Sequence, residues 1–259
     1  MPSMDSPLRE RDHDRAALRG EPSYVWRAGQ ERRLRMILAG ADGREAGVIL
    51  DNGCGVGEYM TRFAEHTPRV YGLEFDPDHV SSASTLGLKV VQGASERLPF
   101  GDETFDLVLS HEVLEHVVDD RAALEDIVRV LRSPKSESSG GGRLVLFVPN
   151  RGYLFETHGI YLRGRYRFGN IPLVNYLPRR FRDRLAPHVR VYTRGDLERL
   201  FHGLPIKIIH ASRIFGAYDN IIARWPSAGR LLRTVLQALE ATPLRVFGLS
   251  HFWVIERVE

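Results

Sequence analysis

Short apolar runs alternate with helical patterns in the first part of the chain. Residues 48–58 are an apolar run that ends at an acid and continues into a turn with glycine at every second position. A helical segment at 59–66 leads to a second apolar run at 70–74, which also ends in an acid. A strand, a glycine turn, a helix and a second strand ending in a carboxylate predict the nucleoside-binding half of a doubly wound α/β sheet.

The same alternation of strand and helix patterns continues to residue 150. Before the first strand, residues 21–39 carry apolar side chains that predict a helix packed on the sheet. A later helix is indicated by apolar residues at helical spacing, Leu124, Ile127, Val128 and Leu131. The Ser/Gly-rich stretch at 133–142 predicts a mobile surface insertion before the next strand.

The C-terminal part predicts a helix and two more strands. Residues 192–201 have a helical pattern with Thr193 as its N-cap. The segments 206–211 and 250–258 have strand patterns, and helical residues at 221–240 separate them.

Composition limits what the chain can be. Its 259 residues, 43% of them hydrophobic, fit one α/β domain over 21–259 with an elaborated end. The single cysteine, Cys54, excludes an intramolecular disulfide and a cysteine-rich zinc site, and we interpret it as a small packed residue. The polar start, 1–20, lacks the apolar region of a signal peptide and predicts a flexible tail. We therefore expect a cytoplasmic protein without a transmembrane segment.

The glycine spacing favours one kind of ligand. Gly53, Gly55 and Gly57 are followed by Glu58, which stands where a dinucleotide fingerprint has its third glycine. An acid there would repel a pyrophosphate, and no P-loop lysine follows. A ligand with a ribose and a cationic or zwitterionic tail fits better, because Glu74 can accept hydrogen bonds from two ribose hydroxyls.

These motifs, with three further segments, resemble class I S-adenosylmethionine (SAM) dependent methyltransferases of the methyltransferase type 11-like kind. The further segments are 92–100, 105–111 and 143–150, which are similar to the adenine-contacting loop and the fourth and fifth strands of that family. The resemblance implies a Rossmann-like sheet of seven strands, whose last two strands form an antiparallel pair. It also implies that SAM is the cofactor.

The resemblance carries roles to individual residues. It implies that Asp51 and the glycines Gly53, Gly55 and Gly57 surround the methionine portion of SAM. It implies that Glu74 holds the ribose hydroxyls, and that Phe75 flanks the adenine. Many relatives have an aspartate where Ala94 stands, so the adenine would be bordered by backbone groups of Ala94 and Ser95. His111 would contribute through its carbonyl near the amino-acid tail.

A second constellation, Glu112-Val113-Leu114-Glu115-His116, follows the fourth predicted strand. If it is helical, Glu112 shares a face with Glu115 or His116, and two carboxylates with an imidazole suit Mg²⁺ or another divalent cation. This E-x-x-E-H is similar to the metal motif of ubiquinone-biosynthesis and small-RNA 2′-O-methyltransferases. The latter resemblance makes His188 a fourth ligand, because a Tyr-Thr-Arg stretch follows it at 192–194.

A metal-free alternative uses the same histidines. His116, His188 or His158 would then be the general base, since imidazole titrates near neutral pH. In a third interpretation these histidines are structural, and the glutamates cap helices or form ion pairs.

The acceptor is less defined by the sequence. The absence of motifs for methylation of base amino groups or of pyrimidine carbon favours an oxygen acceptor. Residues 151–192 are crowded with arginine and aromatic residues and stand where the family places its substrate cap. Arginine favours carboxylate or phosphate, and aromatic side chains favour rings, sugars or lipid chains.

Three acceptor classes stay open: a small molecule or glycan precursor, an RNA terminus, and a lipid-linked substrate at a membrane surface. The last would use an apolar face formed by Trp225, Leu231, Leu232, Val235, Leu236 and Leu239. We interpret that face as ordinary core or a dimer contact in a monomeric or homodimeric protein. A non-catalytic SAM-binding scaffold is disfavoured, because Asp51, the glycines and Glu74 are all present.

Overall fold

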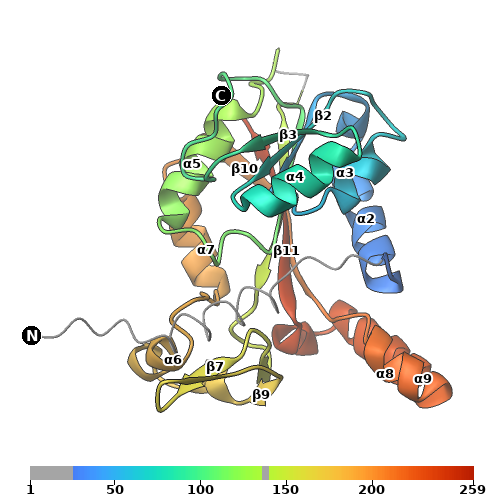
Figure 1. Cartoon of the computed structure of the whole chain (residues 1–259), viewed down its shortest axis with the longest axis vertical. Coiled ribbons are helices and arrows are strands. Elements are labelled where there is room, and N and C mark those ends of the chain that lie inside the picture. Colours follow the sequence, from blue (N-terminus) through green and yellow to red (C-terminus); the bar gives the residue numbers. More distant parts are fainter. Residues whose placement is uncertain (1–25, 136–139) are drawn as a thin grey trace, which may run out of the picture.

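The computed structural model describes residues 26–135 and 140–259 (Figure 1). The expected tail at 1–20 lies outside the described residues, and so does part of the expected insertion at 133–142. Within the described part of the chain, no helix is both long enough and apolar enough to cross a membrane.

One seven-stranded sheet forms the centre, in the order β10-β11-β5-β4-β1-β2-β3. Strands β1 to β5 pair in parallel, whereas β11 runs antiparallel to both β5 and β10. This confirms the predicted doubly wound sheet with an antiparallel end. The strands are β1 (Ile49–Asn52), β2 (Val70–Glu74), β3 (Lys89–Gln92), β4 (Leu107–His111), β5 (Arg143–Pro149), β10 (Ile206–Ile214) and β11 (Ser250–Arg257).

Helices cover both faces of the sheet because its central strands are apolar on both sides. One core joins α2 (Ala28–Ala41) and α3 (Glu58–Phe63) to the sheet through side chains such as Ile37 and Met60. The other joins α5 (Asp120–Val130) and α7 (Arg194–Phe201) through Leu124 and Leu197. All four side chains are fully buried, and each contributes roughly 1.5–3 kcal/mol of transfer free energy. A further helix, α4 (Pro77–Thr85), connects β2 to β3.

The predicted cap of helix α7 is confirmed. The Thr193 hydroxyl accepts from the backbone N–H of Asp196, and the Asp196 carboxylate accepts from the backbone N–H of Thr193. The predicted helix at 21–39 corresponds to α2, which spans Ala28–Ala41, and residues 21–25 of the prediction lie outside the described residues.

Residues 151–192 leave the sheet after β5 and fold as a separate layer at the lower end of the view in Figure 1. They form two small two-stranded sheets, a short helix and a 3₁₀ turn around a buried ion pair, in which Arg182 lies 2.7 Å from Glu156. The elements are β6 (Phe155–Glu156), β7 (Ile160–Leu162), β8 (Arg165–Arg167), β9 (Ile171–Pro172), the 3₁₀ turn (Val174–Tyr176) and α6 (Arg179–Leu185).

Between β10 and β11 the chain forms a helical hairpin and two 3₁₀ turns. The elements are α8 (Asp219–Arg224), α9 (Pro226–Ala238) and the turns Leu239–Ala241 and Pro243–Phe247. Helices over 221–240 were predicted, and the structure confirms them.

Candidate functional site

A cavity of about 530 Å³ lies at the carboxyl ends of β1, β2 and β4. In a parallel sheet these ends meet at one edge, which is where doubly wound folds bind ligands. All the predicted cofactor residues line it except Gly57, namely Asp51, Gly53, Gly55, Glu74, Phe75, Ala94, Ser95 and His111.

The glycine turn has the shape that its sequence requires. Gly53 has a φ of 78°, and a Cβ there would lie 2.2 Å from a methyl carbon of Val113. Gly57 also has positive φ and is the N-cap of α3, and a Cβ there would meet Leu88 at 2.2 Å. Gly57 therefore shapes the turn beneath the cavity, whereas Gly53 lines it.

The Glu74 carboxylate ties the tip of β2 to this turn. Its Oε2 accepts from the backbone N–H of Gly55 at 2.8 Å, and its Oε1 accepts from the N–H groups of Phe75 and Asp76, each at 2.9 Å. A carboxylate has about four acceptor positions. Glu74 can therefore hold the turn and still accept from a ligand in the cavity that it lines.

Asp51 lies at the end of β1 in a position that suits a cationic ligand. The side chain is buried, and its Oδ2 has no hydrogen-bond partner within the described structure. Burial raises the pKa of Asp51 to about 7, and the negative charge of Glu74 adds to the rise. A cation in the cavity would offset both effects and favour the ionised carboxylate.

The side of the cavity that Phe75 and Ser95 line also contains Glu96 and Val118, which the motifs did not reveal. Ser95 turns its hydroxyl away and donates to Asn52 at 2.9 Å, so it borders the cavity through its backbone. Phe75 and Val118 line the cavity with 75% and 88% of their surfaces exposed. Glu96 also lines it and accepts from the backbone N–H of Val118 at 2.7 Å, which joins the 92–100 loop to the 111–118 turn.

Two more lining residues come from helices. Gln30 on α2 and Tyr59 on α3 both reach the cavity. The amphipathic pattern gave only the buried face of α2, and nothing in it indicated that the first turn of the helix meets the ligand edge.

The segment that carries E-x-x-E-H is a turn, so the expected helical face is wrong. Glu112 follows β4 with a left-handed backbone, φ 57°, while its N–H donates to the carbonyl of Phe147 at 3.0 Å. This conformation prevents a helix from starting directly after the strand. Glu112 nevertheless lies close enough to Glu115 that its negative charge adds to burial in raising the pKa of Glu115.

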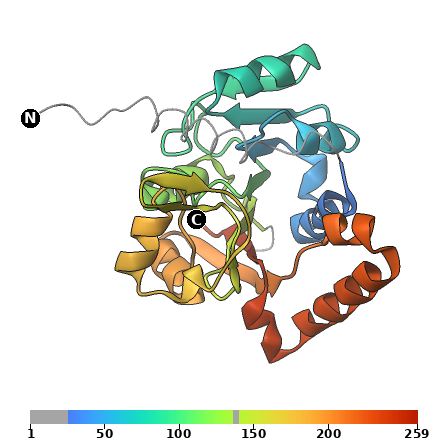
Figure 2. The same cartoon turned by 60° about the horizontal axis from the view of Figure 1, so that its bottom comes forward.

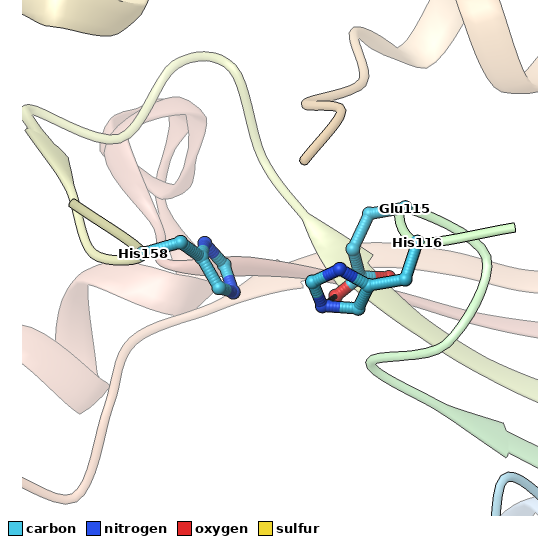
Figure 3. A group of neighbouring side chains, drawn as sticks. All are labelled: Glu115, His116 and His158. Carbon is cyan, nitrogen blue, oxygen red and sulfur yellow. Dashed lines mark ion pairs between the residues drawn. The ribbon is translucent and has the colours of Figure 1, made fainter. Parts of the chain in front are cut away.

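Glu115, His116 and His158 form a compact cluster, which Figure 3 shows. One potential ligand atom from each lies within 4.8 Å of the others. Glu115 is 1% exposed, and neither of its carboxylate oxygens has a hydrogen-bond partner within the described structure. Buried carboxylates are normally paired, so this group is suited to bind something that the cluster lacks.

Glu156, which lies outside the cluster, orients His158. Its Nδ1 lies 3.2 Å from Glu156 Oε1, and its backbone N–H donates to the same oxygen at 3.0 Å. The other oxygen of Glu156 accepts from buried Arg182. The ion pair in the 151–192 layer therefore fixes the imidazole that faces His116, whose ring centroid is 5.5 Å away.

The other two predicted ligands lie beside the cluster. His188 places its Nε2 3.1 Å from the carbonyl oxygen of His158, and its ring makes T-shaped contacts with the rings of Tyr161 and Tyr166. Glu112 accepts from the Ser250 hydroxyl at 2.8 Å. The sequence pattern thus located Glu115 and His116, whereas the structure brings His158 to them.

His116 and His188 are neutral at pH 7. Burial lowers the pKa of His116 to about 4, and His158 contributes to the shift. Burial also lowers the pKa of His188. Neutral imidazole is the form that binds a metal ion or accepts a proton.

Replacement of Glu115 by glutamine is expected to stabilise the metal-free protein. The raised pKa means that the folded state binds a proton that the unfolded chain releases, so stability falls as pH rises above the ordinary glutamate pKa. Glutamine has nearly the same shape and carries no charge. We expect it to raise the free energy of unfolding by about 1–3 kcal/mol, with a gain that grows with pH in denaturant titrations. A less stable variant at pH 8 would contradict this.

A second, larger cavity of about 1040 Å³ meets the first at His116, Val117 and Val118. Arginines from several elements line it, namely Arg121, Arg151, Arg179, Arg182, Arg190 and Arg199. Acids also line it, and several of the arginines donate to them or to carbonyls. The cavity has room for a small molecule beside the cluster.

Comparisons with known proteins agree with this geometry. Residues 50–134 match a family described as a methyltransferase domain. The chain is 27% identical over 106 residues to the uncharacterized methyltransferase YcgJ of Bacillus subtilis, an overlap of 38% of this chain and 42% of that protein. It is 32% identical over 126 residues to a demethylmenaquinone methyltransferase of Thermobifida fusca, or 46% and 50% of the two chains. The chain thus spans half or less of these curated relatives.

Solved structures share the fold over a longer span. A SAM-dependent methyltransferase from Mesorhizobium loti superposes with a TM-score of 0.59 at 21% identity, covering 89% of this chain and 98% of that one. The YcgJ structure from Bacillus subtilis gives 0.56 at 20% identity, covering 88% and 99%. Likeness at these identities concerns the fold.

Proposed function

We propose that this chain, which carries a methyltransferase domain of the class I SAM-dependent family, transfers the methyl group of SAM to a hydroxyl oxygen of a small molecule or of a glycan or lipid precursor. The observation that carries the proposal is the pair of carboxylates in the 530 Å³ cavity. Asp51 is buried and lacks a partner, which suits the cationic amino-acid tail, and Glu74 suits the ribose. When bound, SAM supplies an electrophilic methyl group.

The domain assignment follows from this proposal. Residues 21–259 form one methyltransferase domain, and 151–192 are its substrate cap. The cap supplies His158 to the cluster beside the 530 Å³ cavity, and it supplies Glu156, which orients His158. It also supplies Arg151 and Arg179 to the larger cavity, which favours an acceptor that carries phosphate or carboxylate.

The role of the chain in the reaction is mostly positioning. An in-line methyl transfer needs the acceptor oxygen held close to the methyl group and relieved of its proton. The cluster of Glu115, His116 and His158 lies next to the cofactor cavity, which His116 also lines. With no ion bound, His158 is the general base, and Glu156 holds its ring in place.

The same cluster fits a divalent cation. Glu115 has two unpartnered buried oxygens, and a carboxylate orients His158, as is common for metal-binding histidines. Two imidazoles with a carboxylate suit Mn²⁺ or Zn²⁺ better than Mg²⁺, which prefers oxygen ligands. A bound ion would lower the pKa of an acceptor hydroxyl.

Calorimetric titration of SAM into the purified chain, with and without Mn²⁺, tests the proposal. We expect micromolar binding with one site per chain. Absence of binding in both conditions would overturn the cofactor assignment and favour a scaffold. An RNA acceptor, the alternative substrate, would reveal itself by product yields that fall steeply with salt.

SAM affinity is expected to fall as pH drops below 7. The free protein has Asp51 largely protonated there, because its pKa is raised to about 7, and the cationic ligand requires the carboxylate. Below pH 7 each unit should weaken binding by up to about tenfold, and titrations in buffers of different ionisation enthalpy should detect proton release. Asp51→Asn should bind weakly with a flat pH profile. A wild-type profile as flat as that of the variant would contradict this role.

A further inference from the structure

The α8–α9 hairpin exposes an apolar face that the fold does not cover. It projects away from the sheet in Figures 1 and 2. Leu231, Leu232 and Val235 lie on one side of α9, since residues three and four apart are neighbours on a helix, and all three are exposed. Of the two interpretations of this face, ordinary core is therefore wrong for these three residues, and a dimer contact stays a prediction.

Helix α8 packs against a different side of α9. Gly229 is the only buried residue of α9, and a Cβ there would lie 2.7 Å from the Cα of Ile222 on α8. The glycine thus lets the two helices approach closely. The leucine face stays open to solvent, and Trp225, at the start of α9, is also exposed.

The charged side chains of the hairpin that lack both an ion pair and a hydrogen bond to a described residue are all positive. Arg224, Arg230 and Arg233 form no ion pair with any described residue, and neither does Arg245 in the 3₁₀ turn that follows. The two acids of the segment are turned inward. Asp219 accepts from the backbone N–H of Gly29, and Glu240 accepts from Arg32.

The 151–192 layer repeats this combination at the same end of the molecule, as both views show (Figures 1 and 2). Leu162, Leu173 and Phe181 are exposed there. Exposed arginines accompany them, namely Arg163, Arg165, Arg167, Arg180 and Arg184. Two segments far apart in sequence therefore carry exposed apolar and cationic side chains at the same end of the molecule.

We propose that the α8–α9 hairpin docks on the surface of an anionic phospholipid bilayer. Leu231, Leu232 and Val235 would enter the boundary between headgroups and acyl chains, and the arginines would bind lipid phosphates. Trp225 has the amphipathic ring that is enriched at this depth. The hairpin is too short and too polar to span the membrane, so it lies in the interface plane.

Other occupants match the surface less well. Nucleic acid would use the arginines but gains nothing from an aliphatic face. A second copy of the chain would cover the leucines, but a two-fold contact places the same unpaired arginines opposite one another. A bilayer with anionic lipids satisfies both features.

Docking there would bring the bilayer to a series of cavities. One of about 420 Å³ lies at the base of α8 and shares Tyr153 and Thr157 with a second of about 220 Å³. The second reaches Glu112, which also lines the cofactor cavity. This series offers a lipid-linked acceptor a route from the membrane, a consequence that rests on the proposed function.

Flotation of the full chain with phosphatidylcholine vesicles, with or without phosphatidylglycerol, tests the docking. We expect binding to the phosphatidylglycerol vesicles that weakens with salt. Leu231→Ser combined with Val235→Ser should lower the partition coefficient by roughly tenfold or more. Leu86→Ser is the matched control, because Leu86 at the end of α4 is 66% exposed, like Leu231, and it should bind as wild type.

Several outcomes would overturn the proposal. The first is that the wild type does not float with vesicles. The second is that the double variant floats as well as the wild type. The third is that the wild type is a dimer, which the two serine substitutions dissociate, and binds no vesicles. Binding of single-stranded RNA that needs the arginines but not the leucines would also overturn it. Calorimetric SAM binding, which the double variant should keep, tests the proposed function separately.

Discussion

Replacing Glu74 with alanine is expected to weaken SAM binding by roughly a hundredfold or more. A hydrogen bond to a charged group contributes about 1.5–3 kcal/mol, and two ribose hydroxyls would lose their acceptor. The loss is compounded because the same carboxylate accepts from the backbone N–H of Gly55 and so holds the glycine turn. Calorimetry against SAM measures the effect.

Two variants complete this experiment. Glu74→Gln keeps the shape and one acceptor oxygen, so its affinity should lie between those of wild type and alanine. Glu65→Ala removes an exposed acid near the end of α3 and should leave affinity unchanged. Unchanged SAM affinity in Glu74→Ala, with circular dichroism showing a folded protein, would remove Glu74 from the ribose site.

The sheet and the lining of the 530 Å³ cavity at its edge could be predicted from the sequence because their signals are local. A buried parallel strand is a short apolar run, and the turn is recognisable because glycine is favoured where the backbone needs positive φ. Asp51 and Glu74 stand at strand ends, so the sheet itself brings them to one edge. This is why the lining of the cavity contains nearly all of the predicted cofactor residues.

The cluster was only half predictable because it depends on tertiary placement. Glu115 and His116 adjoin β4, but the third group comes from the 151–192 layer, whose path no periodic pattern describes. His188 stood in a motif-like context, yet the ion pair of Glu156 with Arg182 orients His158 instead. Backbone geometry was a second obstacle, since the left-handed conformation of Glu112 has no sequence signature.

The exposed hairpin face shows the limit of amphipathic patterns. The spacing of Leu231, Leu232 and Val235 identifies a helix with one apolar side, and the structure contains that helix. The spacing does not say what covers the apolar side. Burial supplies that information, and it shows a face open to solvent.

His158→Ala is expected to abolish Mn²⁺ binding, whereas His188→Ala should weaken it by about tenfold to a hundredfold. His158 belongs to the group whose ligand atoms lie within 4.8 Å of one another, and its loss removes a ligand. His188 contacts the backbone carbonyl of His158 and so acts on the cluster through another residue. Electron paramagnetic resonance of free Mn²⁺ measures both affinities without knowledge of the acceptor.

The Mn²⁺ affinities of the two variants decide which histidine is the metal ligand. The sequence motif implies His188, and the structure favours His158. If His188→Ala abolishes Mn²⁺ binding while His158→Ala retains it, the metal site uses the ligand set that the motif suggested. If wild type binds no divalent ion, the cluster works through His158 as a base, and Glu156→Gln should then shift the pH profile of methyl transfer. In either case SAM affinity should be nearly unchanged in both alanine variants, because neither His158 nor His188 lines the cofactor cavity.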